Sequence, residues 1–430
     1  MENKMKRIAV HTLGCKVNQY DTEAMLEAFE RAGYTAVSMK EEAEVYLVNT
    51  CTVTGTGDQK SEKLIRRLAR LHPDCAIVVA GCLAQRKSGE LLMMDNVRLV
   101  IGVQRRSEVV SLVERAIAED TRINAVSSLK NADFENLFVT RHEGKTRATM
   151  KIQEGCDRWC AYCIIPAVRG PVRSMPLEKV RCEAERLAAS GYREIVVTGI
   201  HLGSYGRNTD DTLLSAIRAV HDAPGVERVR LGSLEPVTVT EDFAKGLSEM
   251  PGMMRQFHLS MQSGSDTVLQ RMKRRYTSEE YYAACCLLRK YMPDCAITTD
   301  VIAGFPGETG QEFAETMAFI EKVGFARIHA FPYSRRSGTV ADRMPEQVDE
   351  NQKHIRTNKL IALGNKLEEN FVKGLEGSVQ SVLFEEPVGD VLAEGYTGQY
   401  VRVRAQAAPG SIHRVRIVRT EGTLAWGEVI

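Results

Sequence analysis

Residues 154–163 read Glu-Gly-Cys-Asp-Arg-Trp-Cys-Ala-Tyr-Cys and place Cys156, Cys160 and Cys163 in a C-x3-C-x2-C pattern. A four-iron cluster usually takes one protein thiolate on each of its irons. Three closely spaced thiolates therefore hold three irons and leave the fourth open to a substrate or cofactor. The pattern predicts an iron–sulfur centre that takes part in chemistry and does more than carry electrons.

A structural zinc site is the alternative for the same cysteines. Such sites are closed by four Cys or His ligands. The nearest upstream histidine, His142, lies too far along the chain for a usual zinc knuckle. The spacing therefore favours the iron–sulfur centre.

The size and composition of the chain are those of a protein with several cores. Its 430 residues suggest two to four domains, and 43% of them are hydrophobic. No stretch approaches the run of about 18 apolar residues that a membrane span requires, and the N-terminus lacks the pattern of a signal peptide. Eleven cysteines, an odd number, do not suggest a disulfide framework. We expect a cytoplasmic protein without a membrane segment.

The charge of the chain is balanced, with 57 basic and 56 acidic residues and a net charge of +1. No global attraction to polyanions follows, and each local basic group is first interpreted as a solvated face. Three such groups stand out: Arg66, Arg67 and Arg70; Arg271, Lys273, Arg274 and Arg275; and Arg402, Arg404, Arg414, Arg416 and Arg419.

Residues 1–119 alternate short apolar runs with helical periodicity. The runs IAVHTLG, EVYLVNT, CAIVVAG and VRLVIGV are typical of buried strands, and residues 21–31, 57–71 and 107–119 of helices. The alternation predicts an α/β domain with an open parallel sheet.

Three further cysteines follow strands of this predicted sheet. Cys15, Cys51 and Cys82 each come just after the carboxyl end of a strand, where ligands gather in open α/β sheets. One such cysteine is readily explained as a core residue. Three in equivalent positions predict a second cluster site.

A polar linker, residues 120–146, precedes a second run of βα units over residues 147–370. Six strands are predicted there, at ATMKIQEG, EIVVTGI, RVRLGSLE, QFHLSMQ, CAITTDVIAGF and ARIHAFPY. Six βα units predict a partial barrel with its functional groups at the carboxyl ends of the strands. The candidates at these ends are Thr198, Gly199, Glu235, Gln262 and Asp300.

Residues 371–430 lose the helical pattern. The segments GSVQSVLFEE, YVRVRAQ and HRVRIVRTE alternate as short antiparallel strands do, and they predict a small β-barrel. Arginines recur on one face of these strands, at Arg402, Arg404, Arg414 and Arg416. Such rows suit a phosphate backbone, although a solvated sheet face explains them equally well.

The cysteine run with Tyr162 before its last cysteine resembles the signature of radical S-adenosylmethionine enzymes. The resemblance implies that the open iron binds the methionyl end of the cofactor. It also implies that an electron from the cluster cleaves the cofactor to a radical that abstracts hydrogen from a C–H bond. In that superfamily the residue at the position of Tyr162 lies near the adenine.

Nearly the whole chain resembles the methylthiotransferase family within that superfamily. The resemblance is carried by TLGCKVNQYDTE, NTCTVTGTGDQKS and AGCLAQR, by GCDRWCAYCIIPAVRGPVRS, HLSMQSGSDTVLQRMKRRYT, DVIAGFPGET and HAFPYSRRSGTVA, and by a tail like the RNA-binding TRAM domain. It implies two [4Fe–4S] clusters, one on Cys156, Cys160 and Cys163, the other on Cys15, Cys51 and Cys82. The second would carry the sulfur to be inserted, and S-adenosylmethionine would supply methyl group and radical.

Three branches of the family share this layout. They modify isopentenyladenosine in tRNA, an aspartate of a ribosomal protein, or threonylcarbamoyladenosine at tRNA position 37. Lys16-Val17 after the first cysteine resembles the third branch, whereas the others typically have Gln-Met or Pro-Lys there. The expected partner is therefore the anticodon loop of tRNA, with a sulfur donor and an electron donor left unidentified.

Roles beyond the cluster ligands are expectations of the same kind. Tyr162, Thr198, Gly199, Glu235, Gln262 and Asp300 are candidates for the cofactor pocket, and Arg275 for a carboxylate or phosphate contact. The other cysteines, Cys75, Cys182, Cys285, Cys286 and Cys295, are assigned to packing. A non-enzymatic iron–sulfur protein that binds RNA as a redox sensor is the alternative of another class, and it would need no cofactor pocket.

Overall fold

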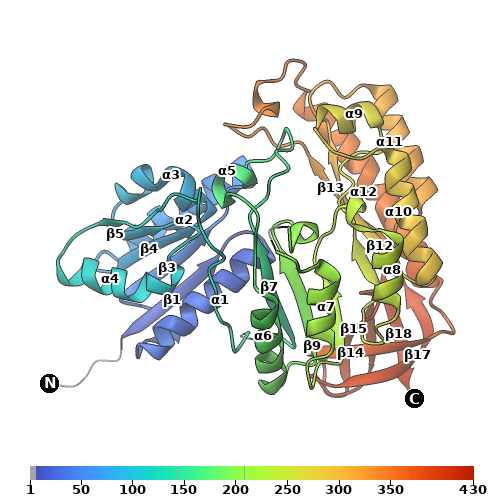
Figure 1. The fold of residues 1–430 in the computed structure, drawn as a ribbon, viewed down its shortest axis with the longest axis horizontal. Coiled ribbons are helices and arrows are strands. Elements are labelled where there is room, and N and C mark those ends of the chain that lie inside the picture. Colours follow the sequence, from blue (N-terminus) through green and yellow to red (C-terminus); the bar gives the residue numbers. More distant parts are fainter. Residues whose placement is uncertain (1–5, 143, 208) are drawn as a thin grey trace.

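A computed structural model describes residues 6–142, 144–207 and 209–430. The first five residues of the predicted N-terminal domain and residue 143 of the predicted linker lie outside them. Three bodies follow one another along the chain in Figure 1, from the blue N-terminal sheet through the green and yellow strands to the red barrel.

The N-terminal body is a parallel sheet in the order β2-β1-β3-β4-β5-β6. Its two central strands are buried along their whole length, because they are continuous apolar runs covered on both faces. The strands are β1 (Arg7–Thr12), β2 (Thr35–Val37), β3 (Val45–Thr50), β4 (Ala76–Gly81), β5 (Val97–Ile101) and β6 (Ile123–Asn124). The predicted parallel sheet is confirmed, and the short edge strands β2 and β6 add to it.

Helices cover both faces of this sheet (Figure 1). Helices α1 and α4 pack on one face with Met25, Phe29 and Leu112, and α2 and α3 on the other with Ile65 and Leu91. Their bounds are α1 (Lys16–Arg31), α2 (Gly55–Leu71), α3 (Cys82–Leu92) and α4 (Val109–Ala118), the last preceded by the 3-10 turn η1 (Arg106–Glu108). Helix α3, which begins at Cys82, was not among the predicted helices.

The central body contains six parallel strands, as predicted. They form two sheets, β10-β9-β7-β8 and β11-β12-β13. Two isolated bridges connect these sheets, one between Val229 and Met253 and one between Leu234 and Leu259. The strands are β7 (Arg147–Glu154), β9 (Glu194–Gly199), β10 (Arg228–Leu231), β11 (Gln256–His258), β12 (Ala296–Ala303) and β13 (Arg327–Pro332), with the short antiparallel β8 (Arg173–Ser174) beside β7. The partial barrel is confirmed.

Helices connect these strands. They are α5 (Ile165–Arg169), α6 (Leu177–Ala189), α7 (Leu213–His221), α8 (Glu241–Ser248), α9 (Asp266–Arg271), α10 (Ser278–Tyr291), α11 (Gly310–Val323) and α12 (Glu350–Lys373), with the 3-10 turns η2 (Leu202–Ser204), η3 (Pro236–Thr238) and η4 (Ala341–Arg343). None of the described helices has the length and apolar character that crossing a membrane requires.

The C-terminal body is a closed barrel in the order β14-β15-β16-β18-β17. Its strands are β14 (Val379–Val388), β15 (Leu392–Thr397), β16 (Arg402–Gln406), β17 (Ile412–Glu421) and β18 (Leu424–Val429). The predicted small barrel is confirmed, but β16 and β18 pair in parallel, so it is not wholly antiparallel. Its core includes Phe384, Val403 and Ile417, and Val372 from the end of α12 packs against it.

Buried ion pairs fix the bodies against one another. Arg228 and Arg230 of β10 both pair with Glu194 of β9 and donate to backbone carbonyls of the C-terminal barrel. On the other side, Asp21 of α1 pairs with Lys151 of β7 at 2.5 Å, where both side chains are almost fully buried. The cysteine-bearing edge of the first sheet is thereby held against the central barrel.

Candidate functional site

Cys15, Cys51 and Cys82 lie at one edge of the N-terminal sheet. They follow β1, β3 and β4, which are neighbours in the sheet, so their carboxyl ends meet. Gly14, before Cys15, has a φ of +115°, and a Cβ there would lie 2.9 Å from Cβ of Cys51. The loops after β1 and β3 are therefore in contact, and only glycine fits between them.

These thiols differ in exposure and in their partners. Cys15 is exposed and Cys82 is buried. Burial raises the pKa of Cys82 to about 11, and the positive charge of Arg169 opposes this. The guanidinium Nε of Arg169 donates to Sγ of Cys82 at 3.1 Å, and the backbone N–H of Val53 donates to Sγ of Cys51 at 3.5 Å. These donors suit sulfurs that carry negative charge as metal-bound thiolates.

Cys156, Cys160 and Cys163 occupy the loop between β7 and α5. Gly155 opens this loop with a φ of +76°, and a Cβ there would lie 1.8 Å from the carbonyl oxygen of Pro171. The N–H of Cys156 donates to Gly170 at 3.1 Å, and the N–H of Ile165 donates to Sγ of Cys163 at 3.4 Å. The loop is thus fixed by its backbone.

The middle of this loop is anchored to the barrel. The N–H of Ala161 donates to the carbonyl of Met272 at 2.9 Å, and its carbonyl accepts from Ala341 at 2.8 Å. Burial raises the pKa of Cys156 to about 11 and that of Cys163 to about 12. Free thiols would stay protonated at neutral pH, so deprotonation here needs a metal or a cation.

A buried carboxylate and three basic groups lie beside these cysteines. Glu235 pairs with Arg158 at 2.8 Å, with His201 at 2.9 Å and with Arg274 at 3.0 Å. Arg274 also donates to Sγ of Cys160 at 3.3 Å. Burial alone raises the pKa of Glu235, but the hydrogen bond from His201 and the charge of Arg274 lower it to about 2. The carboxylate is therefore ionised and is matched by more than one cation.

The sequence had pointed to Arg275, but its neighbour Arg274 lies at the cysteines. Arg275 is exposed, whereas the side chain of Arg274 is 6% exposed. Arg158 and His201 were also missed. Arg158 stands within the cysteine run, which could have indicated it; His201 lies beyond the end of β9 without a distinguishing pattern.

The other candidates for the cofactor pocket lie at or near the ends of the barrel strands. Tyr162 packs edge-on to Phe305, with 6.5 Å between the ring centres. Thr198 and Gly199 end β9 and pair with Lys151 and Gln153 of β7.

Gln262 and Asp300 are next to each other. The backbone N–H of Gln262, at a φ of +72°, donates to the carbonyl of Asp300 at 2.9 Å. The carboxylate of Asp300 lies 3.3 Å from Nε2 of His258. Both residues lie on the β11–β12 side of the barrel. There Gln262, in the segment after β11, forms a parallel bridge with Val301 of β12.

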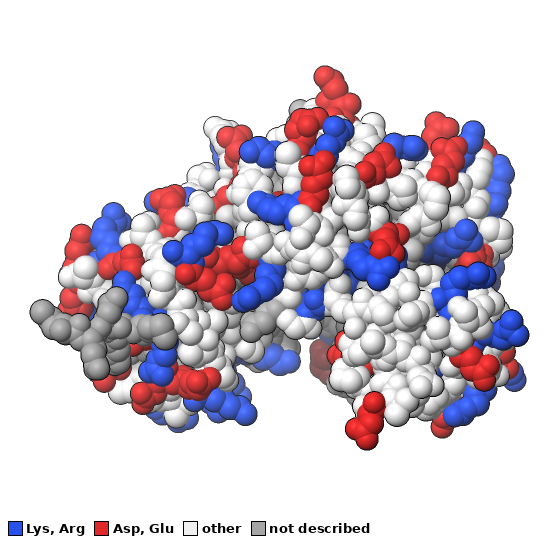
Figure 2. All heavy atoms as spheres, turned by 90° about the horizontal axis from the view of Figure 1, so that it is seen from below, with Lys and Arg blue, Asp and Glu red and all other residues white. Residues whose placement is uncertain are grey.

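The predicted arginines of the C-terminal barrel are on its outer surface. Arg402, Arg414 and Arg416 are exposed, while the intervening Val403 and Val415 point into the core. Arg404 is half-buried and donates to Glu394 at 2.9 Å. β18 separates the two arginine-bearing strands. On the face of the molecule in Figure 2, basic and acidic side chains are interspersed, in line with the balanced net charge.

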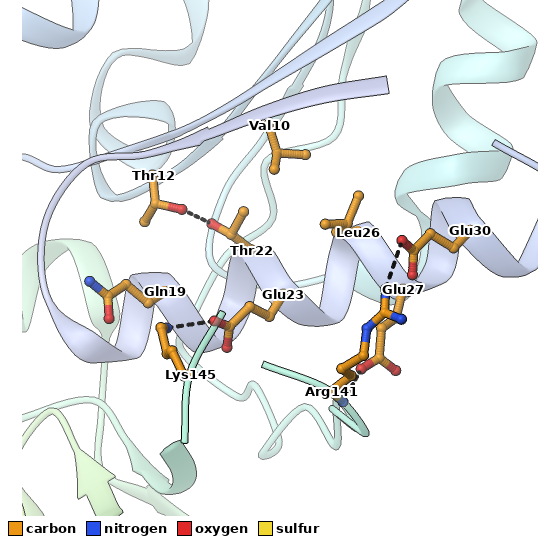
Figure 3. A pocket seen from close by; sticks show the side chains of 10 residues that line it. All are labelled: Val10, Thr12, Gln19, Thr22, Glu23, Leu26, Glu27, Glu30, Arg141 and Lys145. Carbon is orange, nitrogen blue, oxygen red and sulfur yellow. Dashed lines mark hydrogen bonds and ion pairs between the residues drawn. The ribbon is translucent and has the colours of Figure 1, made fainter. Parts of the chain in front are cut away.

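A groove between α1 and the segment before β7 contains none of the candidate residues (Figure 3). Its acidic side chains are engaged by that segment: Glu23 accepts from Lys145 at 2.6 Å, and Glu27 accepts from the backbone N–H of Arg141 at 2.9 Å. His142, considered for a zinc site, pairs with Glu23. These contacts therefore hold the linker against α1.

The thiol arrangement bears on the type of metal. Among the residues that the structure describes, no three His, Cys, Asp or Glu side chains close around one point as a single ion requires. In a four-iron cluster each thiolate binds a different iron, so the sulfurs stand further apart. The two sets of three cysteines, each with backbone and arginine donors, fit such clusters.

Comparison with known proteins gives two matched regions and relatives along the whole chain. Residues 7–102 match an uncharacterised protein family, UPF0004, and residues 150–320 match the radical SAM superfamily. The threonylcarbamoyladenosine tRNA methylthiotransferase MtaB of Bacillus subtilis is 41% identical over 96% of this chain and 94% of that protein. The tRNA-2-methylthio-N(6)-dimethylallyladenosine synthase of Clostridium novyi is 33% identical over 89% of this chain and 86% of that protein.

Among solved structures, the radical S-adenosylmethionine methyltransferase TsrM of Kitasatospora setae is similar, with a TM-score of 0.56 and 15% identity. The similarity covers 76% of this chain and 72% of that one. At this identity it supports the fold alone.

Proposed function

This chain belongs to the methylthiotransferase family of radical S-adenosylmethionine enzymes, and we propose that it converts N6-threonylcarbamoyladenosine at position 37 of tRNA into its 2-methylthio derivative. The convergence of two separate cysteine triads on the contact between the N-terminal sheet and the barrel carries the proposal. The greater identity to a relative named for threonylcarbamoyladenosine, 41% against 33% for one named for dimethylallyladenosine, favours this substrate.

We assign one cluster to each triad. Cys156, Cys160 and Cys163 would hold a [4Fe–4S] cluster with an open iron for S-adenosylmethionine, and Cys15, Cys51 and Cys82 would hold a second one. With S-adenosylmethionine bound, the first supplies radical chemistry at a C–H bond. The assignment divides the chain into an N-terminal domain (1–119), a linker (120–146), a radical domain (147–370) and a TRAM-like domain (371–430).

The residues around the first triad hold charge and exclude water. Arg274 faces Cys160, and with Arg158 it balances the thiolates and Glu235. Tyr162 and Phe305 form an apolar wall beside the same loop. Thr198, Gly199, Gln262 and Asp300 are proposed to line the cofactor pocket, because they lie toward the carboxyl ends of the strands.

The reaction requires both triads near one base. C2–H of adenine has no acidic proton, so general acid–base catalysis cannot activate it, whereas hydrogen abstraction can. The base must also be accessible, and an anticodon loop presents unpaired bases without melting a duplex. The arginines on the outer surface of the C-terminal barrel are proposed to contact tRNA phosphates.

Nucleoside mass spectrometry of tRNA from cells with and without the gene tests the substrate. We expect loss of 2-methylthio-threonylcarbamoyladenosine alone, with the unmethylthiolated nucleoside accumulating. A gene copy carrying Cys156→Ala should fail to restore it, whereas Cys286→Ala, which changes an exposed cysteine outside both triads, should restore it. Loss of the isopentenyl counterpart would assign the chain to another branch. Loss of neither nucleoside would contradict a tRNA substrate.

A further inference from the structure

Helix α2 presents a stripe of cations to solvent. Lys60, Lys63, Arg67 and Arg70 recur at intervals of three and four residues, so they share one helix face. All four are exposed, and none forms an ion pair or hydrogen bond through its side chain with another described residue. Arg66, the fifth cation of this helix, pairs with Glu62 at 3.2 Å and is not counted in the stripe.

The acidic residues of α2 do not neutralise this stripe. Asp58 is buried and pairs with Arg86 at 3.0 Å and with Arg336 at 2.7 Å. Glu62 is already shared between Arg66 and Lys87. The exposed charge of the helix is therefore positive along its length, although the whole chain is almost neutral.

The helix starts at the proposed reaction site. Its N-cap is Thr54, three residues after Cys51, and Asp58 in its first turn pairs with Arg336 of the segment after β13. That segment, drawn in orange in Figure 1, reaches from the barrel to the N-terminal body, where Arg336 donates to Thr52 beside Cys51. The stripe leads away from this point along the outer side of the helix.

We propose that this stripe binds the phosphate backbone of the tRNA stem adjoining the anticodon loop, which rests on the proposed function. From Lys60 to Arg70 the stripe spans about 15 Å. One strand of B-form DNA carries a phosphate about every 3.4 Å of its axis, and the phosphates of an RNA stem are at least as closely spaced, so the stripe is long enough to face about four of them. A base held at the cysteine edge places the flanking stem beside the helix that starts there.

The test compares two variants of equal charge. The stripe variant carries Lys60→Gln, Lys63→Gln, Arg67→Gln and Arg70→Gln, which keep helix propensity. The control carries Lys40→Gln, Arg115→Gln, Arg181→Gln and Lys245→Gln, four exposed cations on other surfaces. Binding of tRNA and of an isolated anticodon stem-loop is measured from low to high salt, with circular dichroism to check folding.

For the stripe variant, we expect a salt slope smaller by about 3, because each lost phosphate contact removes about 0.7–0.9 from the slope, and binding that is weakened most at low salt. The control should keep the wild-type slope. Equal losses in both variants, or an unchanged slope in the stripe variant, would overturn the inference. A loss seen with full-length tRNA but not with the stem-loop would overturn the assignment to this stem. A wild-type protein that does not bind tRNA would instead refute the proposed function.

Discussion

The guanidinium of Arg169 donates from Nε to Sγ of Cys82 at 3.1 Å. Arg169 ends α5, six residues after Cys163, so the segment that follows one cysteine triad contacts a member of the other. Its side chain is fully buried, and its Nη1 also pairs with Glu154 at 2.7 Å and with Asp21 at 3.2 Å. One residue therefore links the two proposed cluster sites.

Replacing Arg169 with Gln should lower the reduction potential of the cluster on Cys15, Cys51 and Cys82. A hydrogen bond from a cation stabilises the reduced, more negative cluster. Losing about 1.5 kcal/mol of such stabilisation corresponds to a shift of about 60 mV for one electron. The measurement is a redox titration followed by electron paramagnetic resonance, in protein lacking the Cys156 triad.

Arg106→Gln, which removes the same charge, is the matched control for this experiment. Arg106 is buried in the same network, where it pairs with Asp21 and Glu135 but does not contact a cysteine. Its replacement should leave the potential unchanged even where it costs stability. Equal shifts in both variants would show that the buried positive charge, and not the hydrogen bond to sulfur, sets the potential.

Iron analysis tests the two-cluster assignment. Anaerobically reconstituted protein should contain about eight irons per chain, and replacing Cys156, Cys160 and Cys163 with Ala should leave about four. Replacing Cys75, Cys182 and Cys295 with Ala should leave the iron content unchanged, because these cysteines lie outside both triads. A wild-type content near four would rule out the second cluster.

The two triads should have separable roles. A variant with Cys15→Ala, Cys51→Ala and Cys82→Ala should still cleave S-adenosylmethionine reductively, because the other triad is intact. It should not transfer a methylthio group to tRNA. Chromatography of 5′-deoxyadenosine and mass spectrometry of the tRNA nucleosides measure the two outcomes. If this variant still methylthiolates tRNA, sulfur does not come from that site.

Regular patterns made the fold and the cysteine positions predictable. Cys15, Cys51 and Cys82 each follow a buried parallel strand, and parallel strands bring their carboxyl ends to one edge. The contact between Arg169 and Cys82 joins residues 87 positions apart, for which no local pattern exists. Likewise, Lys273 takes a φ of +58°, which breaks the helical spacing and turns Arg274 inward while Arg275 faces solvent. Periodicity cannot choose between adjacent arginines across such a turn.

A buried carboxyl group at the contact between α1 and α6 should make stability depend on pH. Burial raises the pKa of Glu183 to about 7, although Tyr20 donates to it at 2.8 Å. Because the folded pKa exceeds the unfolded value of about 4.3, stability falls as pH rises between these values. Glu183→Gln should therefore stabilise the protein at pH 8, by at most about 4 kcal/mol, and change little at pH 4. Thermal unfolding of the anaerobic protein at both pH values measures this, and equal effects at both would contradict it.

Removing the arginines of β16 should weaken tRNA binding through phosphate contacts. Arg402 and Arg404 point outward from the C-terminal barrel, and both lie near Glu394, at 3.6 and 2.9 Å. If they contact phosphate, Arg402→Ala with Arg404→Ala should reduce the salt slope of binding by about 1.5 and leave cofactor cleavage intact. Glu394→Gln should do the opposite and strengthen binding, because it removes the carboxylate that competes for both guanidinium groups. An unchanged slope in the arginine variant, together with unchanged affinity in Glu394→Gln, would show that this side of the barrel does not face the RNA.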